Sequence, residues 1–136
     1  MAYRIYNKFP ADLQRGRRAI GFSLPFTGDA VFNPTYTTKD QIKSNLINYF
    51  LTNKGERVFN PLFGANLRAR LFEQITNNNM ALLQKQISDD LKIYFPLVSV
   101  QKLEVIDNKD ENSYNVILTY NVVNFGISDT INLTVQ

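Results

Sequence analysis

The side chains available for acid–base or nucleophilic chemistry are carboxylates and lysines, because the 136 residues of the chain include no cysteine and no histidine. This composition excludes disulfides, thiolate nucleophiles and Ser-His-Asp arrangements, and it removes the commonest ligands of zinc, copper and iron. Any catalysis would have to come from a pair of carboxylates, from a lysine, or from a magnesium site built only of Asp and Glu.

A pair of carboxylates across a cleft would suit glycoside hydrolysis, which needs two such groups at a defined separation, one of them with a raised pKa. The helical half of the chain offers Glu56, Glu73, Asp89 and Asp90. Asp89 and Asp90 are adjacent, so on a helix their side chains point about 100° apart, and Glu73 is expected on the solvent side of a helix. The spacing of Gly55 and Gly64 is not that of a nucleotide-binding loop. We therefore expect no catalytic residue, no cofactor and no metal site.

Residues 55–64 form the most specific local pattern, with two glycines, a proline, three large apolar residues and an adjacent Glu-Arg pair. We expect an ordered, partly buried turn, because Phe59, Leu62 and Phe63 would otherwise face water. The two glycines would otherwise only increase the conformational entropy that the chain loses on folding. The functional interpretation is that Glu56 and Arg57 fix this turn and present it to a partner subunit. The alternative is a helix cap or a surface ion pair, which contributes roughly 0–1 kcal/mol.

The first 18 residues carry essentially all of the net charge of +3. Against Asp12 they hold five basic residues, namely Arg4, Lys8, Arg15, Arg17 and Arg18. With the aromatic side chains of Tyr3, Tyr6 and Phe9, these could bind nucleic acid. Arginine is also favoured in protein interfaces, and the chain has no recognised nucleic-acid motif. We therefore expect a protein partner or a solvated arm, with nucleic acid as the weaker alternative.

Prolines and glycines interrupt residues 1–36, so we expect an extended, irregular N-terminal arm with at most one strand over residues 19–26. Residues 37–136 then form a single domain, and a chain of this size can bury roughly two thirds of its unfolded surface. No apolar run approaches the roughly 18 residues that span a bilayer, and the N-terminus lacks the apolar segment of a secretory signal. We expect a soluble protein made in a cytoplasm, with no membrane partner.

Helical periodicity begins at Thr38, which with Gln41 has the spacing of a capping box, and the pattern ends at Lys54 and Gly55. A second, shorter helix is predicted around residues 67–75, and a third over residues 79–95, where Pro96 ends it. The apolar faces of these helices are expected in the core: Ile42, Leu46, Tyr49 and Phe50; Leu67, Leu71 and Ile75; Met80, Leu83, Ile87, Leu91 and Tyr94. The aromatic residues are also assigned to the core: Tyr49, Phe50, Phe59, Phe63, Phe72, Tyr94 and Phe95.

After Pro96 the apolar period drops to two, with a change of phase near Gln101 and Lys102 that predicts a bulge. A polar turn over residues 107–113 and strands over residues 114–123 and 130–136 complete an antiparallel meander. The predicted fold class is α+β, with about three helices packed on a C-terminal antiparallel three-stranded meander. The last strand has no charge after Asp129 and no proline, so we expect an unprotected sheet edge that can accept a strand from another chain.

The turn and its surroundings resemble a known family. Over about residues 36–136, the pattern Thr52, Gly55-Glu56-Arg57, Asn60-Pro61, Phe63-Gly64 and Leu71-Phe72-Glu73 is similar to the baseplate wedge and sheath-initiator proteins of contractile-tailed phages. Proteins of that family have carried a lysozyme-like label, and they are related to a subunit of type VI secretion baseplates. The chain departs from the family at Phe95-Pro96-Leu97, where an acidic residue often precedes the proline and a basic residue often follows it.

The resemblance implies a structural subunit of a contractile-tail baseplate, located in the virion tail and assembled in the host cytoplasm. It implies that the subunit docks on baseplate wedge subunits and templates the first ring of the tail sheath protein by β-strand exchange. The wedge-facing turn would comprise Gly55, Glu56, Arg57, Asn60, Pro61, Phe63 and Gly64. The sheath-facing edge strand would comprise Thr130, Ile131, Asn132, Leu133, Thr134 and Val135. The alternatives are a peptidoglycan-degrading, lysozyme-like enzyme and a nucleic-acid-binding module.

Overall fold

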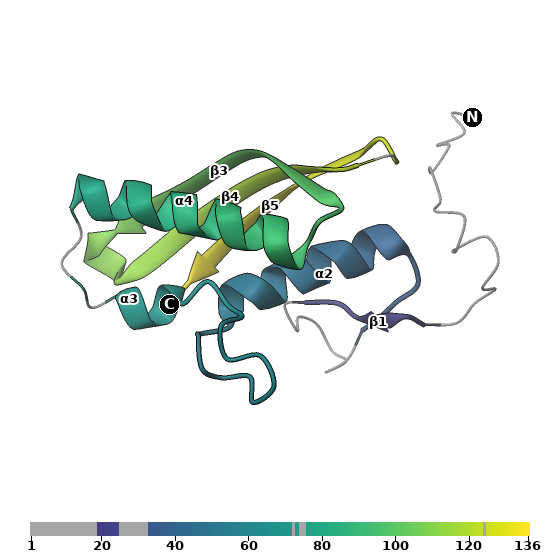
Figure 1. Cartoon of the computed structure of the whole chain (residues 1–136), viewed down its shortest axis with the longest axis horizontal. Helices are drawn as coiled ribbons and strands as arrows, with labels where there is room; N and C mark the ends of the chain where they lie inside the picture. Colours follow the sequence, from purple (N-terminus) through teal and green to yellow (C-terminus); the bar gives the residue numbers. More distant parts are fainter. Residues whose placement is uncertain (1–18, 25–32, 72, 74–75, 124) are drawn as a thin grey trace.

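The computed structural model of the chain describes residues 19–24, 33–71, 73, 76–123 and 125–136. Helices pack on one face of an antiparallel three-stranded sheet, which confirms the predicted α+β class (Figure 1). The basic residues of the predicted arm, residues 1–18, lie outside the described residues. None of the helices in the described part of the chain combines the length and the apolarity that a membrane crossing requires.

Helix α2 (Thr38–Leu51) begins one residue earlier than predicted, because its N-cap is Thr37 and not Thr38. The Thr37 hydroxyl accepts a hydrogen bond from the Asp40 amide at 3.2 Å, so it satisfies an amide that has no partner within the helix. The helix also ends three residues before the predicted Lys54. At that end the Thr52 hydroxyl donates to the Asn48 carbonyl at 2.6 Å and the Thr52 backbone turns extended.

Helix α3 (Leu67–Arg70) is only four residues long, shorter than predicted. The amides of Leu71 and Glu73 donate to carbonyls three residues back, so the chain tightens into turns instead of continuing as an α-helix. The predicted core position Ile75 and the aromatic Phe72 lie outside the described residues.

Helix α4 (Asn77–Tyr94) starts at the N-cap Thr76, whose hydroxyl accepts from the Asn79 amide at 3.3 Å. Its predicted apolar face is confirmed. Leu83, Ile87 and Leu91 are buried, and Met80 and Tyr94 pack against the core as partly buried residues at its ends. The helix ends before Pro96, as the sequence predicted.

The sheet consists of β3 (Val98–Asn108), β4 (Ser113–Val122) and β5 (Ile127–Val135), in that order. The predicted bulge is confirmed by a shift of register between Val100 and Lys102. The connection between β3 and β4 is shorter than predicted, because both strands run further. It is the 3-10 helix η1 (Lys109–Glu111) followed by Asn112, which takes the left-handed conformation at φ 48°.

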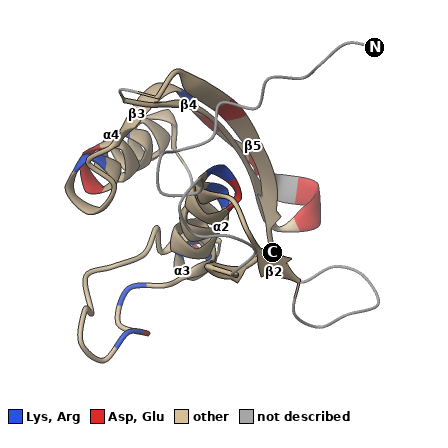
Figure 2. Ribbon diagram, turned by 90° about the vertical axis from the view of Figure 1, so that its right-hand side faces the viewer, with Lys and Arg blue, Asp and Glu red and all other residues tan. Residues whose placement is uncertain are grey.

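One face of the sheet carries the core. In β4 the side chains at alternate positions are buried, namely Tyr114, Val116, Leu118, Tyr120 and Val122, and Ile131 and Val135 of β5 lie beside them. Both long helices lie on the concave side of the sheet, with α4 packed on β3 and α2 packed on β5 (Figure 2). Among the described residues, helices therefore cover one face of the sheet only.

Two short strands differ from the predicted irregular arm. β1 (Gly21–Phe22) pairs antiparallel with β2 (Pro34–Thr35), and both contact α2. Side chains attach this pair to the helix, because the Thr35 hydroxyl donates to Gln41 Oε1 at 2.6 Å and the Leu24 amide donates to Ser44 Oγ at 3.3 Å. Strands of two residues are too short to produce a period-two pattern in the sequence.

Two buried tyrosines in β4 offer a matched test of the packing. The Tyr114 hydroxyl donates to the Arg70 carbonyl at 3.1 Å, whereas the buried Tyr120 hydroxyl has no hydrogen-bond partner among the described residues. Burial raises the pKa of both hydroxyls, so both remain neutral near pH 7.

We expect Tyr114→Phe to lower the free energy of unfolding by about 1 kcal/mol, because it leaves the Arg70 carbonyl without its donor. Tyr120→Phe should leave stability unchanged or raise it, because it removes a desolvated and unpaired hydroxyl. Urea unfolding of both variants measures the difference. A larger loss for Tyr120→Phe than for Tyr114→Phe would contradict this description of the core.

Candidate protein-interaction site

The turn between α2 and α3 is tied to the core at its base by Tyr49. The Tyr49 carbonyl accepts from the amides of Thr52 at 3.4 Å and Ala65 at 3.1 Å, on the two sides of the turn. The Thr52 carbonyl in turn accepts from the Asn66 amide at 3.3 Å. The two ends of the turn are therefore joined by main-chain hydrogen bonds, and the prediction of an ordered turn is confirmed.

Two glycines shape this turn by taking positive φ angles. Gly64 has φ 124°, and a Cβ atom at this position would overlap the Thr52 carbonyl oxygen. Gly55 has φ 90°, with open space where a Cβ would lie, and its amide donates to the Pro61 carbonyl at 2.7 Å. Gly64 thus permits the close approach at the base, and Gly55 helps to close the outer part of the turn.

Glu56 and Arg57 do not form an ion pair with each other, so the alternative of a surface ion pair between them does not hold. Glu56 Oε1 accepts from Asn53 Nδ2 at 3.0 Å. The Arg57 guanidinium lies over the ring of Phe63, with its carbon 3.8 Å from the ring centroid. Each charged residue therefore stabilises the turn through a different neighbour, and the charge of Arg57 stays available at the surface.

The outer end of the turn is apolar and exposed. Val58, Phe59 and Leu62, which we call the apolar tip, are 88%, 101% and 69% exposed. In Figures 1 and 2 the turn projects away from the sheet. The expectation that Phe59 and Leu62 are partly buried was therefore wrong, whereas Phe63 is buried as predicted, at 6% exposure.

Sequence reasoning omitted the apolar tip from the candidate interface because it treated apolar side chains as core. A usable signal was present, since Val58, Phe59 and Leu62 sit between turn-forming residues and share no helical or strand period with a neighbouring element. An exposed cluster of this kind on an ordered turn is typical of a docking site for another protein.

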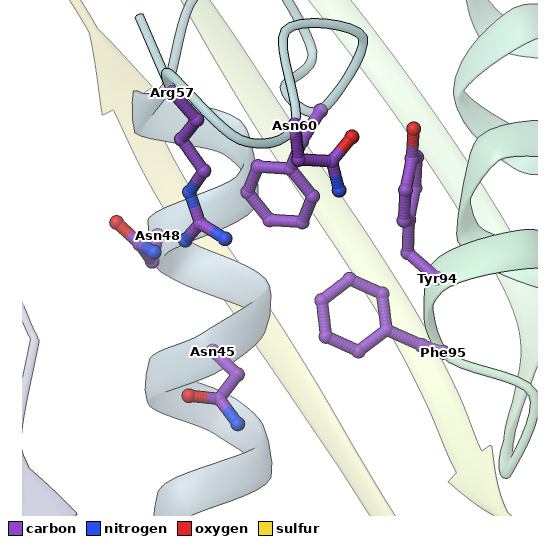
Figure 3. Close-up of a pocket in the computed structure, with 7 residues that line it drawn as sticks. Asn45, Asn48, Arg57, Asn60, Tyr94 and Phe95 are labelled. Atoms are coloured by element: carbon purple, nitrogen blue, oxygen red, sulfur yellow. The ribbon is translucent and has the colours of Figure 1, made fainter.

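A polar pocket lies beside the turn. It has a volume of about 360 Å³ and is lined by Asn45, Asn48, Arg57, Asn60, Phe63, Tyr94 and Phe95 (Figure 3). Helix α2 supplies Asn45 and Asn48, and the turn supplies Arg57, Asn60 and Phe63. Tyr94 and Phe95 come from the C-terminal end of α4. The pocket therefore joins the turn to the C-terminal end of α4.

A hydrogen bond from Tyr49 holds α4 against this region. The Tyr49 hydroxyl donates to Asp90 Oδ2 at 3.0 Å, and Lys54 Nζ lies 3.7 Å from the same oxygen. Burial, together with the charge of Asp90, raises the pKa of the Tyr49 hydroxyl. Tyr49 therefore stays a neutral donor in the physiological range.

The predicted edge strand is confirmed at the sheet edge, since β5 pairs with β4 alone among the described strands. Its side chains alternate, so that Ile131 and Val135 are buried and Leu133 is partly buried. Thr130, Asn132 and Thr134 are exposed on the other face. The opposite edge, β3, carries the bulge and an ion pair of Lys102 with Glu104 at 3.0 Å, both of which discourage pairing with another chain.

The register of β5 shows which backbone groups face the free edge. The Thr130 amide donates to Asp129 Oδ1 at 2.9 Å instead of to β4. Because pairing with β4 is unbroken and antiparallel residues alternate between bonded and non-bonded pairs, the amides of Asn132 and Thr134 also face the free edge. Asp129 thus occupies the edge donor of Thr130, and the amides of Asn132 and Thr134 donate to none of the described residues.

The carboxylates do not form a glycosidase arrangement in the described part of the chain. Glu56 and Glu73 are exposed, Asp89 pairs with Lys92 at 3.7 Å, and Asp90 is engaged by Tyr49. The pocket beside the turn has no carboxylate in its lining. No group of three or more Asp or Glu side chains that could hold a metal ion occurs among the described residues.

Comparison with known proteins gives one family and a small set of relatives. The family model of baseplate wedge protein gp25 matches residues 37–134. The baseplate wedge protein gp25 of Enterobacteria phage T4 is 29% identical over 82 residues, which cover 60% of this chain and 62% of the phage protein. The chain thus matches less than two thirds of the length of this curated relative.

Two solved structures share the fold. One is a Geobacter sulfurreducens protein provisionally assigned as a tail lysozyme, with a TM-score of 0.63, 18% identity, and coverage of 73% of this chain and 90% of that one. The other is in the baseplate of the anti-feeding prophage, with a TM-score of 0.51, 16% identity, and coverage of 83% and 81%. At these identities the likeness concerns the fold alone.

The close approach at Gly64 can be tested against Gly55 in the same turn. We expect Gly64→Ala to lower the free energy of unfolding by at least about 2 kcal/mol, because the methyl group meets a main-chain oxygen and φ is positive. Gly55→Ala should lower it less, since only the conformational strain applies. Denaturant unfolding gives both values, and equal losses would show that the base of the turn is not closely packed.

Proposed function

This chain belongs to the family of baseplate wedge protein gp25, and we propose from that premise that it is a structural subunit of a contractile-tail baseplate. In this proposal the subunit is part of the virion tail and is assembled in the host cytoplasm. It docks on other baseplate wedge subunits through the turn at residues 55–64, and it templates the first ring of tail sheath protein through the edge of β5. It does so as a structural element and not as an enzyme.

The observation that carries the docking role is the exposure of the apolar tip on an ordered turn. The side chains of Val58, Phe59 and Leu62 face water. Main-chain hydrogen bonds at the base of the turn and in its outer part fix the backbone that carries them. A preorganised loop loses little conformational entropy on binding, so burial of these side chains would translate efficiently into affinity. Of the predicted turn residues, Phe63 and Gly64 are buried and act as support, whereas Arg57 and Pro61 are exposed and available for contact.

The templating role is supported by the asymmetry of the sheet edges. The edge of β3 is protected by a bulge and a charged pair, whereas β5 presents the free amides of Asn132 and Thr134. A strand from a sheath subunit could pair there by β-augmentation, with main-chain hydrogen bonds supplying the contact. The side chains of Ile131 and Val135 would support this edge from the core and would not contact the added strand directly.

The lysozyme-like alternative rests on one structural relative, and the described part of this chain contains no arrangement of carboxylates that supports it. Glu56 is exposed and bonded to Asn53, and the polar pocket lacks a carboxylate. If the protein degraded peptidoglycan, purified protein would clear cell walls and Glu56→Gln would abolish the clearing. We propose that folded protein gives no clearing at all.

The nucleic-acid alternative depends on Arg15, Arg17 and Arg18, which lie outside the described residues. It requires binding with a steep salt dependence that is lost when these three arginines are replaced by alanine. The family model matches residues 37–134 and does not reach these arginines. The partner of the arm therefore stays a prediction, as does the boundary between an arm of residues 1–36 and a domain of residues 37–136.

The edge of β5 can be tested without removing the strand. Deleting residues 130–136 would also remove the buried Ile131 and Val135, so loss of assembly could reflect unfolding. Asn132→Pro removes one edge amide and leaves the bonds to β4 in place, because proline is tolerated on the open side of an edge strand. Asn132→Ala is the control, since it removes the same side chain and keeps the amide.

We expect particles with Asn132→Pro to contain baseplates that carry this subunit but no sheath, whereas Asn132→Ala particles assemble sheath of normal length. Electron microscopy of negatively stained particles, with quantification of the subunit in purified baseplates, provides both readouts. Sheath of normal length on Asn132→Pro baseplates would refute the templating role while leaving the docking role intact.

The apolar tip gives the matching test of docking. We expect Phe59→Ser to reduce incorporation of the subunit into baseplates at least tenfold, because an exposed aromatic residue in such a site is typically a main anchor. Leu82→Ser is the control, since Leu82 is also exposed, at 64%, but lies on α4 away from the turn. Both variants should unfold at wild-type denaturant concentration, and normal incorporation of Phe59→Ser would exclude the tip as the anchor.

A further inference from the structure

We infer that the pocket beside the turn binds a carboxylate, borne by an acidic side chain of the protein partner that meets the apolar tip. The inference rests on the proposed function for the existence of such a partner. It adds the chemistry of the contact, which neither the family assignment nor the structural relatives specify. Hydrogen-bond donors line the pocket, one cation there is available, and the pocket lies next to the apolar tip.

The cation is Arg57. Its guanidinium lies 3.8 Å above the ring of the buried Phe63, which fixes its position, and Figure 3 shows Arg57 among the residues that line the pocket. It forms no ion pair with any residue that the structure describes. A guanidinium that stacks on an aromatic ring keeps its N–H groups free at the edge, where they match the two oxygens of a carboxylate.

The amides of the pocket add further donors. Asn45 Oδ1 already accepts from Gln41 Nε2 at 2.8 Å, so the hydrogen bond fixes the orientation of this amide and leaves its NH₂ group to donate. The side chains of Asn48 and Asn60 make no hydrogen bond with the described residues and line the same pocket (Figure 3). One cation, three amides and no acidic residue make this lining suited to an anion.

The shape of the pocket favours an acidic side chain over a small ion. A volume of about 360 Å³ exceeds that of a carboxylate alone, and Tyr94 and Phe95 form an aromatic wall that can contact a methylene stem. A phosphate group carries up to two charges and would be matched poorly by a single arginine. A glutamate side chain fits both the polar and the aromatic parts of the lining.

The position of the pocket identifies the kind of segment that carries the glutamate. Arg57 and Asn60, which line the pocket, are interspersed in the sequence with Val58, Phe59 and Leu62 of the apolar tip. The pocket and the tip therefore share the same ten-residue turn. A partner that covers the tip would therefore place neighbouring residues at the mouth of the pocket. We infer a partner surface on which an acidic residue lies next to an apolar depression.

The experiment is a titration of the full-length, ¹⁵N-labelled protein with three blocked peptides, followed by NMR. The probes are acetyl-Gly-Glu-Gly-amide, which has only a side-chain carboxylate, acetyl-Gly-Gln-Gly-amide, which has none, and acetyl-Gly-Gln-Gly with a free C-terminus. We expect the glutamate peptide to shift the Arg57 Nε–H signal and the side-chain amide signals of Asn48 and Asn60. The blocked glutamine peptide should leave these signals unchanged.

Two variants control the assignment. Arg57→Gln should weaken binding of the glutamate peptide about tenfold or more, because a hydrogen bond to a charged group is lost. Arg68→Gln removes the charge of an exposed arginine outside the pocket and should leave binding unchanged. Equal shifts with the blocked glutamine peptide, unchanged binding in Arg57→Gln, or no shift with any peptide would overturn the inference. Stronger binding of the peptide with the free C-terminus would also overturn it, in favour of a chain-terminal carboxylate.

Peptide binding is measured independently of the proposed function, which is tested by incorporation of the subunit into baseplates. If the subunit enters baseplates and the glutamate peptide does not bind, the carboxylate site is wrong and the structural role stands. If the peptide binds but the subunit is absent from purified baseplates, the pocket is correct and the proposed function is wrong. The two outcomes therefore separate the two claims.

Discussion

The placement of Tyr49 is the constraint on which the rest of the structure depends. Its side chain is fully buried, with the rings of Phe50, Phe63, Tyr94 and Phe95 around it, and its hydroxyl bonds to Asp90. Its carbonyl accepts amides from both sides of the turn that follows α2. One residue therefore joins α2, the turn and α4, and the exposed surfaces of the turn keep a fixed position relative to the sheet.

The two candidate interfaces use this scaffold in different ways. The turn presents side chains, since its backbone groups are bonded within the turn and its apolar tip faces water. The edge of β5 presents backbone groups, because the neighbouring positions on its inner face are committed to the core. Asp129 limits that edge, as it occupies the Thr130 amide and lies 3.5 Å from Lys43 of α2. A strand that pairs with β5 would therefore bond beyond this point, toward the C-terminus.

Periodicity in the sequence predicted the layers of the fold but not the local geometry of the site. The helical spacing of Leu46, Tyr49 and Phe50 and the alternation from Tyr114 to Val122 reflect burial on one face, which a sequence records directly. The ends of α2 and the short strands at Gly21 and Pro34 depend on contacts between distant residues, such as Tyr49 with Ala65, and these leave no local pattern.

The glycine-rich turn was identified, yet the direction of its side chains was not. Phe59 and Phe63 have the same residue type, and only the bond between Gly55 and Pro61 and the packing of Phe63 on Tyr49 separate an exposed from a buried position.

A cryo-electron microscopy map of the intact particle that contains this protein would test the structural role most directly. The account predicts this domain at the junction between the baseplate and the first sheath ring, with Val58, Phe59 and Leu62 buried against another wedge subunit and β5 paired with a strand of the sheath protein. A map in which a different protein fills that junction, or in which the edge of β5 and the apolar tip both face solvent, would contradict it.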